Sequence, residues 1–264
     1  MEVILADYLG FCYGVKRAIH LARSSAQPGS ASTLGPIIHN PQMVARLAEE
    51  GVGTVESLAE VSGGGTVIIR SHGVGPTVYE EAKERELRIV DATCLHVKKA
   101  QMAAHQLSKD GREVVIIGEK KHPEVKSIFE WSGRNAVVIE TEAEAKDLPP
   151  CGKLGIVAQT TFSGDQFQHI VSCLLEKSND IHILRTICTA TDQRQKAAIE
   201  LAEKVDLMLV IGGKNSANTT RLAELCAEKT VTHHIETASE LQDAWFHHKK
   251  ELLKISPKNT LGNY

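Results

Sequence analysis

The chain has 264 residues, of which 42% are hydrophobic, 24% are charged and 4% are aromatic, and its formal net charge is −3. This length allows a sizeable buried core, and the near-neutral charge excludes a global basic field for nucleic acid or an anionic membrane. The scarcity of aromatic residues also argues against base-stacking platforms. The N-terminal sequence lacks the pattern of a signal peptide and no apolar run reaches the length of a membrane span, so we expect a cytoplasmic protein.

One supersecondary unit recurs along the chain, namely a short β-rich apolar run, a polar or glycine-rich loop, and a helical pattern. The expected strands are EVILADY at 2–8, STLG at 32–35, TVIIR at 66–70, LRIV at 87–90, EVVIIG at 113–118, KLGIVAQ at 153–159, IHILRT at 181–186 and DLMLVIGG at 206–213. Strands that alternate with helices predict an α/β fold with parallel sheets and helical covers. Ligands of such sheets bind beyond the carboxyl ends of the strands.

The spacing of polar loops predicts three copies of one module, over residues 1–92, 93–186 and 187–264. A cysteine loop is followed 27 or 28 residues later by a first polar loop, from Cys12 to His39, from Cys94 to His122 and from Cys188 to Ser216. A second polar loop follows in the first two copies, at His72 and at Thr160. The third copy should reach its second loop near 249–254, where KKELLKISPKNTLGNY offers no strand–loop–helix unit. We therefore expect a third module that is incomplete, truncated or altered after about residue 247.

Three cysteines at equivalent module positions could converge on one axis. Three thiolates suit an iron–sulfur cluster or zinc and leave one metal position open; the alternative is that they are merely buried and pack. The remaining cysteines, Cys151, Cys173 and Cys226, lack equivalent positions, and we interpret the latter two as packing residues within helices.

The polar loops offer groups for an anion and a proton. His39, His72 and His122 could donate hydrogen bonds to an anion at strand ends, or could be ordinary surface histidines. Glu124 could deliver protons, or be a carboxylate favoured in the first helical turn. The loop GGKNSANT could cradle a phosphate at a helix start, or be a glycine-rich turn with a capping residue.

The motifs GFCYGVKRAI, HNPQMV, SHGVG, DATC, HPEV, QTT and GGKNSANTTRLAEL occur in one order and spacing. In these motifs, from residue 1 to about Trp245, the chain resembles the 4-hydroxy-3-methylbut-2-enyl diphosphate reductases, iron–sulfur enzymes of the non-mevalonate isoprenoid pathway. The family fold is three α/β modules around a central cluster site, in agreement with the spacing.

The resemblance implies a role for each matching residue. Cys12, Cys94 and Cys188 would hold a 4Fe–4S cluster with one open iron, and Glu124 would donate a proton. The substrate would be bound by His39, His72, His122, Thr160, Ser216, Ala217 and Asn218. The implied reaction is reductive dehydroxylation of an allylic diphosphate to isopentenyl and dimethylallyl diphosphate. A ferredoxin or flavodoxin type protein would supply electrons.

The chain departs from the family pattern at three places. Leu95 replaces the usual proline after the second cysteine, Ala217 stands where many members have serine, and the tail replaces a final serine-containing loop and helix. Two alternatives to an active reductase are therefore a protein whose cysteines hold a structural metal without turnover, and an inactive truncated family member.

Overall fold

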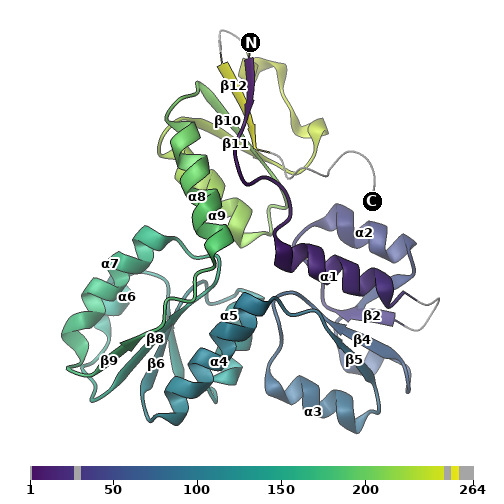
Figure 1. Cartoon of the computed structure of the whole chain (residues 1–264), viewed down its shortest axis with the longest axis vertical. Coiled ribbons are helices and arrows are strands. Elements are labelled where there is room, and N and C mark those ends of the chain that lie inside the picture. The colour runs from purple at the N-terminus through teal and green to yellow at the C-terminus, as the bar shows by residue number, and fades with distance from the viewer. Residues whose placement is uncertain (1, 27–30, 247–250, 256–264) are drawn as a thin grey trace. The chain divides into compact units, whose positions relative to one another are not determined.

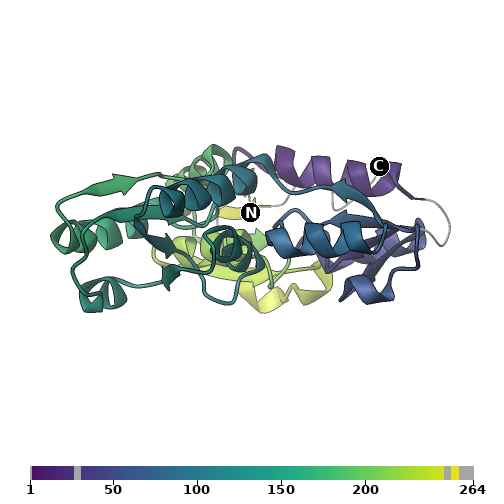
Figure 2. The ribbon, with the colours of Figure 1, turned by 90° about the horizontal axis from the view of Figure 1, so that it is seen from below.

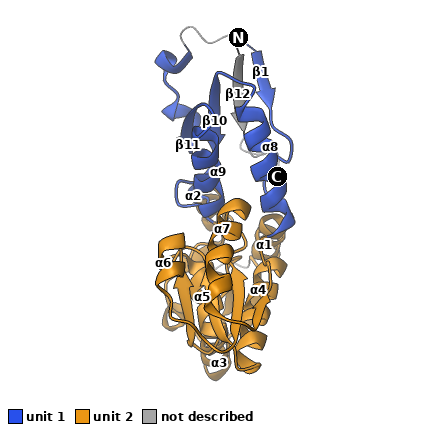
Figure 3. Cartoon of the chain, turned by 90° about the vertical axis from the view of Figure 1, so that its left-hand side faces the viewer, with its two compact units in different colours: residues 1–12, 39–41, 188–264 blue, residues 13–38, 42–187 orange. Residues whose placement is uncertain are grey.

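The computed structural model describes residues 2–26 and 31–246, and the backbone of 251–255. The chain divides into two compact units, which Figure 3 shows in different colours. Unit 1 comprises residues 1–12, 39–41 and 188–264, and unit 2 comprises residues 13–38 and 42–187. No helix in the described part of the chain combines the length and the hydropathy needed to cross a bilayer.

The first sheet of unit 2 is parallel, with the strand order β3-β2-β4-β5. Its strands are β2 (Ala31–Leu34), β3 (Val52–Val55), β4 (Thr66–Ile69) and β5 (Arg88–Asp91). The helices of this stretch of chain are α1 (Tyr13–Ser24), α2 (Pro41–Glu49), α3 (Pro76–Glu84) and the short 3₁₀ helix η1 (Leu58–Glu60). Both α2 and α3 begin with proline, whose fixed φ and missing N–H suit a first helical position.

The second sheet of unit 2 is also parallel and has the order β7-β6-β8-β9. Its strands are β6 (Glu113–Ile117), β7 (Ala136–Ile139), β8 (Leu154–Ala158) and β9 (Ile181–Ile183). The helices between and beside them are α4 (Leu95–Lys109), α5 (Pro123–Trp131), α6 (Glu142–Asp147), α7 (Gly164–Leu174) and the 3₁₀ helix η2 (Leu175–Lys177).

Helices cover both faces of this second sheet, as Figures 1 and 2 show. Because side chains alternate along a strand, β6 directs Val114 and Ile116 into the core with α4 and α5. The intervening residues Val115 and Ile117 pack with α6 and α7 instead. Covers on both faces explain why β6 and β8 are nearly continuous apolar runs.

Unit 1 contains the third parallel sheet, with the order β1-β12-β10-β11. Its strands are β1 (Glu2–Leu5), β10 (Leu207–Ile211), β11 (Val231–Ile235) and β12 (Glu251–Ile255). The helices of this unit are α8 (Thr189–Ala202), α9 (Ala217–Ala227) and the 3₁₀ helices η3 (Ala238–Glu240) and η4 (Asp243–Phe246).

The three sheets share one architecture. When the strands are followed across each sheet from the edge strand β3, β7 or β11, the first three have the same order along the chain, and the other edge strand comes after them. The strand β12 therefore corresponds to β4 and β8, and β1 corresponds to β5 and β9. The expected α/β fold of several similar modules with parallel sheets is thus confirmed.

Two details differ from the sequence analysis. The strand β1, expected within a first module of residues 1–92, pairs with β12 in the third sheet. The strand β12 forms where no strand was expected, because β1 and β10 supply backbone partners on both of its sides. The third module was expected to be altered after about residue 247; of this tail, residues 247–250 and 256–264 lie outside the described residues.

Candidate active site

Each cysteine that the sequence proposes as a ligand lies directly before a helix. Cys12 precedes α1, Cys94 is the N-cap of α4 and Cys188 is the N-cap of α8. Each also follows the strand that occupies the same edge of its sheet, β1, β5 or β9. The unpaired amides of a helix start carry partial positive charge, which stabilises a thiolate ligand. The three positions therefore have the same local chemistry.

The sulfur of Cys188 has close polar neighbours in the first turn of α8. The backbone N–H of Thr191 donates to Cys188 Sγ at 3.3 Å, and Thr191 Oγ1 lies 3.0 Å from the same sulfur. Hydrogen bonds to a sulfur stabilise its anionic form and tune a metal bound to it. Thr191 is 2% exposed, and Cys188 is partly buried.

The loop before Cys94 is fixed by Asp91 and Arg17. Asp91 Oδ1 accepts the Thr93 N–H at 2.9 Å, and Arg17 donates to the carbonyl of Thr93 at 3.2 Å. Burial raises the pKa of Asp91, but bonds from Lys98 and Thr93 outweigh it and hold that pKa below its usual value. Leu95, where the resemblance expects proline, is the first residue of α4, so the helix begins at the expected position without proline.

Glu124 and Thr160 form a buried pair at the strand ends of the second sheet. Glu124 is 2% exposed and lies in the first turn of α5, while Thr160 follows β8 and is 4% exposed. The Thr160 N–H donates to Glu124 Oε1 at 2.6 Å, and the Thr160 hydroxyl donates to Oε2 at 2.9 Å. Burial raises the pKa of Glu124 to about 7, against these two bonds, which lower it. Near neutral pH this carboxyl can both hold and release a proton.

His122 is the N-cap of α5 and adjoins the same pair. Its Nδ1 accepts the Glu124 N–H at 3.2 Å, so the neutral ring carries its proton on Nε2. The ring of His72 meets it edge-on, with centroids 5.4 Å apart and planes at 85°. The structure thus brings His72, His122, Glu124 and Thr160 together within unit 2.

A buried bracket, formed by Ser127 and Gln101, joins the loop that carries His72 to the helix that carries Glu124. Ser127 Oγ lies 3.1 Å from the carbonyl of His72 and 2.8 Å from that of Glu124, and it accepts from Gln101 Nε2 at 3.1 Å. Gly73 has a φ of 72°, and a Cβ there would lie 2.4 Å from Gln101 Nε2. A glycine at 73 therefore leaves room for the bracket.

Gln159 orders the loop that carries Thr160. It is fully buried, its Oε1 accepts the Glu119 N–H at 2.9 Å, and its Nε2 donates to Thr161 Oγ1 at 3.0 Å. Ser127, Gln101 and Gln159 were not predicted from the sequence. Ser127 stands three residues after Glu124 on one helix face, a spacing that could have indicated it.

The remaining predicted residues belong to unit 1. Ser216 is the N-cap of α9 and its Oγ accepts the Thr219 N–H at 3.4 Å, while Ala217 and Asn218 are the first helical residues. A Cβ at Gly213 would lie 2.5 Å from the carbonyl oxygen of His39. The backbone of His39 therefore packs closely against the loop that leads to Ser216.

Parallel α/β sheets with a buried, protonatable carboxyl at the strand ends are typical of α/β enzymes. Comparison with known proteins then identifies the family. The model of the family described as "LytB protein" matches residues 3–256. The chain therefore belongs to the LytB family.

Curated relatives agree on the activity. The chain is 52% identical to the 4-hydroxy-3-methylbut-2-enyl diphosphate reductase of Geobacter metallireducens and 48% identical to that of Citrifermentans bemidjiense. Each alignment covers 93% of this chain and 88% of the relative. The chain is thus an oxidoreductase with a reductase role in isoprenoid synthesis.

Two solved structures have the same fold. One is (E)-4-hydroxy-3-methyl-but-2-enyl diphosphate reductase, the terminal enzyme of the non-mevalonate pathway; it is 42% identical with a TM-score of 0.69, over 96% of this chain and 92% of that one. The other is the E-1-hydroxy-2-methyl-but-2-enyl-4-diphosphate reductase from Plasmodium falciparum, 28% identical with a TM-score of 0.91, over 97% and 83%.

Proposed function

We propose that this enzyme removes the hydroxyl group of (E)-4-hydroxy-3-methylbut-2-enyl diphosphate reductively, forming isopentenyl diphosphate and dimethylallyl diphosphate. The reaction consumes two electrons and two protons, breaks the allylic C–O bond, forms one C–H bond and releases the oxygen as water. The observation that carries the proposal is the buried Glu124 carboxyl, which accepts two hydrogen bonds from Thr160, in a chain of the LytB family.

Glu124 supplies a proton in this proposal. Burial raises its pKa to about 7, so a large share of the carboxyl groups is protonated at neutral pH. The Thr160 hydroxyl, 2.9 Å from Oε2, links the carboxyl to the position proposed for the substrate hydroxyl. Protonation there turns a poor leaving group into water.

The diphosphate would be bound by His39, His72, Ser216 and Asn218, with His122 contributing its Nε2–H. Ala217 and Asn218 open α9, and the free amides of a helix start favour a bound anion. His122 supports this role through its tautomer, because the Glu124 N–H already engages Nδ1.

Cys12, Cys94 and Cys188 would hold a 4Fe–4S cluster. The donor set fits, since three thiolates leave one iron open and each cysteine lies at a helix start. When bound, the cluster would pass the two electrons one at a time from the upstream reductant and would offer a Lewis-acidic iron for the substrate oxygen. We assign the upstream reductant to a ferredoxin or flavodoxin type protein, as the family resemblance implies.

The Glu124→Gln variant tests the proton assignment. The amide keeps the shape and loses the transferable proton, so we expect turnover to fall by about 10²- to 10⁴-fold. The visible spectrum of the anaerobically purified variant should match that of the parent protein. The exposed Glu84→Gln on α3 serves as a control with normal activity. Near-normal turnover of Glu124→Gln would remove Glu124 from the mechanism.

Iron and sulfide analysis tests the metal assignment. Anaerobic protein should contain about four irons and four sulfides, as a 4Fe–4S cluster requires, and Cys94→Ser should lose most of both. Cys226→Ser changes a cysteine that is buried within α9 and should retain them. Zinc without sulfide would contradict the cluster and favour a structural metal site.

A further inference from the structure

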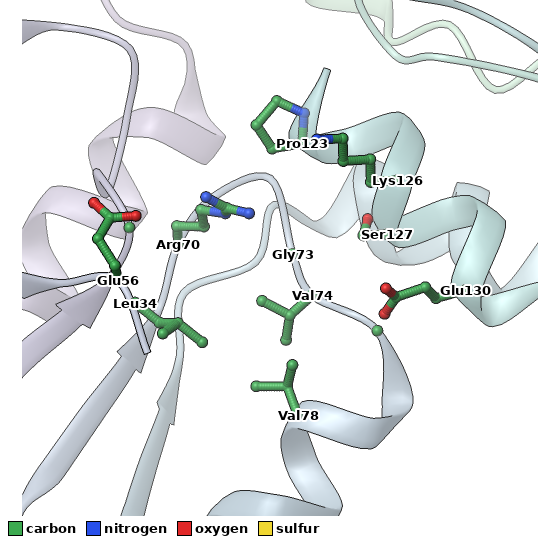
Figure 4. Close-up of a pocket in the computed structure, with 12 residues that line it drawn as sticks. Leu34, Glu56, Arg70, Gly73, Val74, Val78, Pro123, Lys126, Ser127 and Glu130 are labelled. Atoms are coloured by element: carbon green, nitrogen blue, oxygen red, sulfur yellow. The ribbon is translucent and has the colours of Figure 1, made fainter. Parts of the chain in front are cut away.

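A cavity of about 270 Å³ lies in unit 2, beside the loop that contains Gly73 and the first turns of α5 (Figure 4). The end of the strands β2 and β4, the start of α3 and one face of α5 line it. Its lining includes Leu34, Arg70, Val74, Val78, Lys126 and Glu130. The proposed reaction assigns a role to none of these residues.

Arg70 is the first unusual feature of this cavity. It directly follows β4 and reaches toward the side on which α5 carries Lys126 (Figure 4). Its Nε is shielded from solvent and has no hydrogen-bond partner among the described residues. Burial lowers the pKa of the Arg70 guanidinium. The negative charge of Glu56 raises that pKa, but by less than burial lowers it. A partly buried arginine normally has an anionic partner.

The backbone is shaped around this guanidinium. Gly35 follows β2 with a φ of 68°, and a Cβ there would lie 2.5 Å from Arg70 Nη1. At the matching place in the second sheet, Gly118 makes room for Gln159, whose amide oxygen accepts the Glu119 N–H and whose amide nitrogen donates to Thr161 Oγ1. The equivalent group in the first sheet is therefore a cation that faces a cavity.

Among the described residues, the two acidic groups of the cavity form no hydrogen bond or ion pair with Arg70, although the charge of Glu56 acts on it. The Glu130 carboxylate lies against Gly75, where a Cβ would be 1.5 Å from Oε2, and it pairs with Arg134 at 3.7 Å. Glu56 is exposed. Lys126 is also exposed, on the α5 side of the cavity. Two cations thus line this space from different elements, beside an apolar wall of Leu34, Val74 and Val78.

We propose that this cavity binds a small organic anion, with a carboxylate or phosphate head between Arg70 and Lys126 and a short apolar body against Leu34, Val74 and Val78. The planar guanidinium favours such oxyanions through paired N–H donors. The inference does not depend on the proposed reaction, because the assigned catalytic and substrate groups are different residues.

Trp131 provides a local signal for a binding test. Its Nε1 donates at 2.9 Å to the carbonyl of Val74, which lines the cavity. The sequence has two tryptophans, so Trp245→Phe leaves Trp131 as the fluorescent residue. The purified Trp245→Phe protein is titrated with 3-methylbutanoate, with 3-methylbutyl phosphate, and with the neutral isostere 3-methylbutanamide. We expect a saturable change of Trp131 emission with one or both anions and none with the amide. The anion whose titration saturates at the lower concentration identifies the preferred head group.

Three variants in the same background locate the bound anion. Arg70→Met should raise the apparent Kd at least about tenfold, since hydrogen bonds to charged groups are the stronger ones. Lys126→Met should raise it a few-fold and, as a change at an exposed side chain, leaves the fold intact. Lys83→Met, exposed on α3 and outside the lining, should leave it unchanged. No saturable change with either anion, equal response to the amide, or an unchanged Kd in both Arg70→Met and Lys126→Met would overturn the proposal.

Discussion

The second sheet of unit 2 and the sheet of unit 1 have the same strand order but draw their strands from different stretches of chain. The strands β6 to β9 come from one continuous segment, residues 113–183. The matching strands of unit 1 come from 207–255 and from 2–5, so its fourth strand is the first of the chain. The same layered architecture therefore forms whether its edge strand is next in sequence or at the opposite end.

The helix starts α5 and α9 show a second contrast on this shared frame. Both begin with a capping side chain, His122 in α5 and Ser216 in α9. The second helical residue is the ionisable Glu124 in α5 and the neutral Asn218 in α9. A proton-transfer group therefore stands at the helix start in unit 2, and an uncharged hydrogen-bonding group at the equivalent position in unit 1.

The largest expected effect on stability tests this contrast through pH. Burial raises the Glu124 pKa from 4.5 to about 7, so the folded state binds its proton more tightly than the unfolded state. This tighter proton binding stabilises the folded state; the stabilisation is fully present below pH 4.5 and is lost as the pH rises through about 7. Glu124→Gln removes the cost of a buried charge, which corresponds to about 3 kcal/mol.

The measurement is urea unfolding of the parent and Glu124→Gln proteins between pH 5 and pH 8. The free energy of unfolding of the variant, relative to that of the parent, should increase as pH rises. The exposed Glu84→Gln should show no such trend. A difference between Glu124→Gln and the parent that is independent of pH would place the ionised carboxylate in a better-solvated site than the structure indicates.

Glycines after equivalent strands sharpen the comparison of the two sheets. A Cβ at Gly118, after β6, would lie 2.7 Å from Gln159 Cβ and 2.9 Å from Val125 Cγ2, both on buried residues. A Cβ at Gly212, after β10, would meet Thr219 Oγ1 at 2.8 Å and Cγ2 at 3.0 Å. We expect Gly118→Ala to cost about 2–3 kcal/mol of unfolding free energy and Gly212→Ala about 1–2 kcal/mol, because one threonine side chain can rotate.

Chemical denaturation measures both costs, with Gly152→Ala as control, since no atom lies within 4 Å of its Cβ position. Equal costs at Gly118 and Gly212 would mean that the two strand ends are equally packed. A cost of Gly152→Ala similar to that of Gly118→Ala would show a general backbone effect instead.

The Ser127→Ala variant tests the bracket between the two sheets of unit 2. Loss of the hydroxyl leaves Gln101 Nε2 without its partner, so we expect a loss of about 1–2 kcal/mol in stability. Since Ser127 also contacts the carbonyls of His72 and Glu124, kcat should fall more than KM rises. Ser127→Thr keeps the hydroxyl and should recover activity. Lost stability with unchanged kcat would restrict the bracket to a structural role.

The smallest effect compares two serine caps. Ser163 caps α7 in unit 2 and Ser216 caps α9 in unit 1, and each accepts an N–H at 3.4 Å. Each change to alanine should cost about 1 kcal/mol of unfolding free energy. Ser216→Ala should in addition raise KM, because Ser216 is proposed to bind the diphosphate, whereas Ser163→Ala should leave KM unchanged. A similar KM in both variants would remove Ser216 from the binding site.

Much of this fold could be predicted from local patterns. The expected strand runs after residue 30 coincide with β2, β4 to β6 and β8 to β10, because each is a short apolar run before a polar loop and a helix. Ser163 accepts the Gln166 N–H at the start of α7, a spacing that is typical of a helix N-cap. The ordered cysteine and histidine motifs identified the family.

The rest depended on contacts between distant segments. The strand β12 contains charged residues and is stabilised by hydrogen bonds to β1 and β10, which lie far from it in sequence. The roles of Gln101 and Ser127 arise only when α4 and α5 pack beside the His72 loop. The hydrogen-bond partner of a polar residue on a helix can be identified only when the position of the partner's helix or loop is known.

The position of β12 between β1 and β10 sets an order for assembly during synthesis. Both sheets of unit 2 have all their strands once residue 183 has left the ribosome. The N-terminal strand β1, although made first, has its sheet neighbour only after residues 251–255 emerge. During synthesis, residues 2–5, including Val3 and Leu5, therefore lack this strand partner until residues 251–255 have been translated.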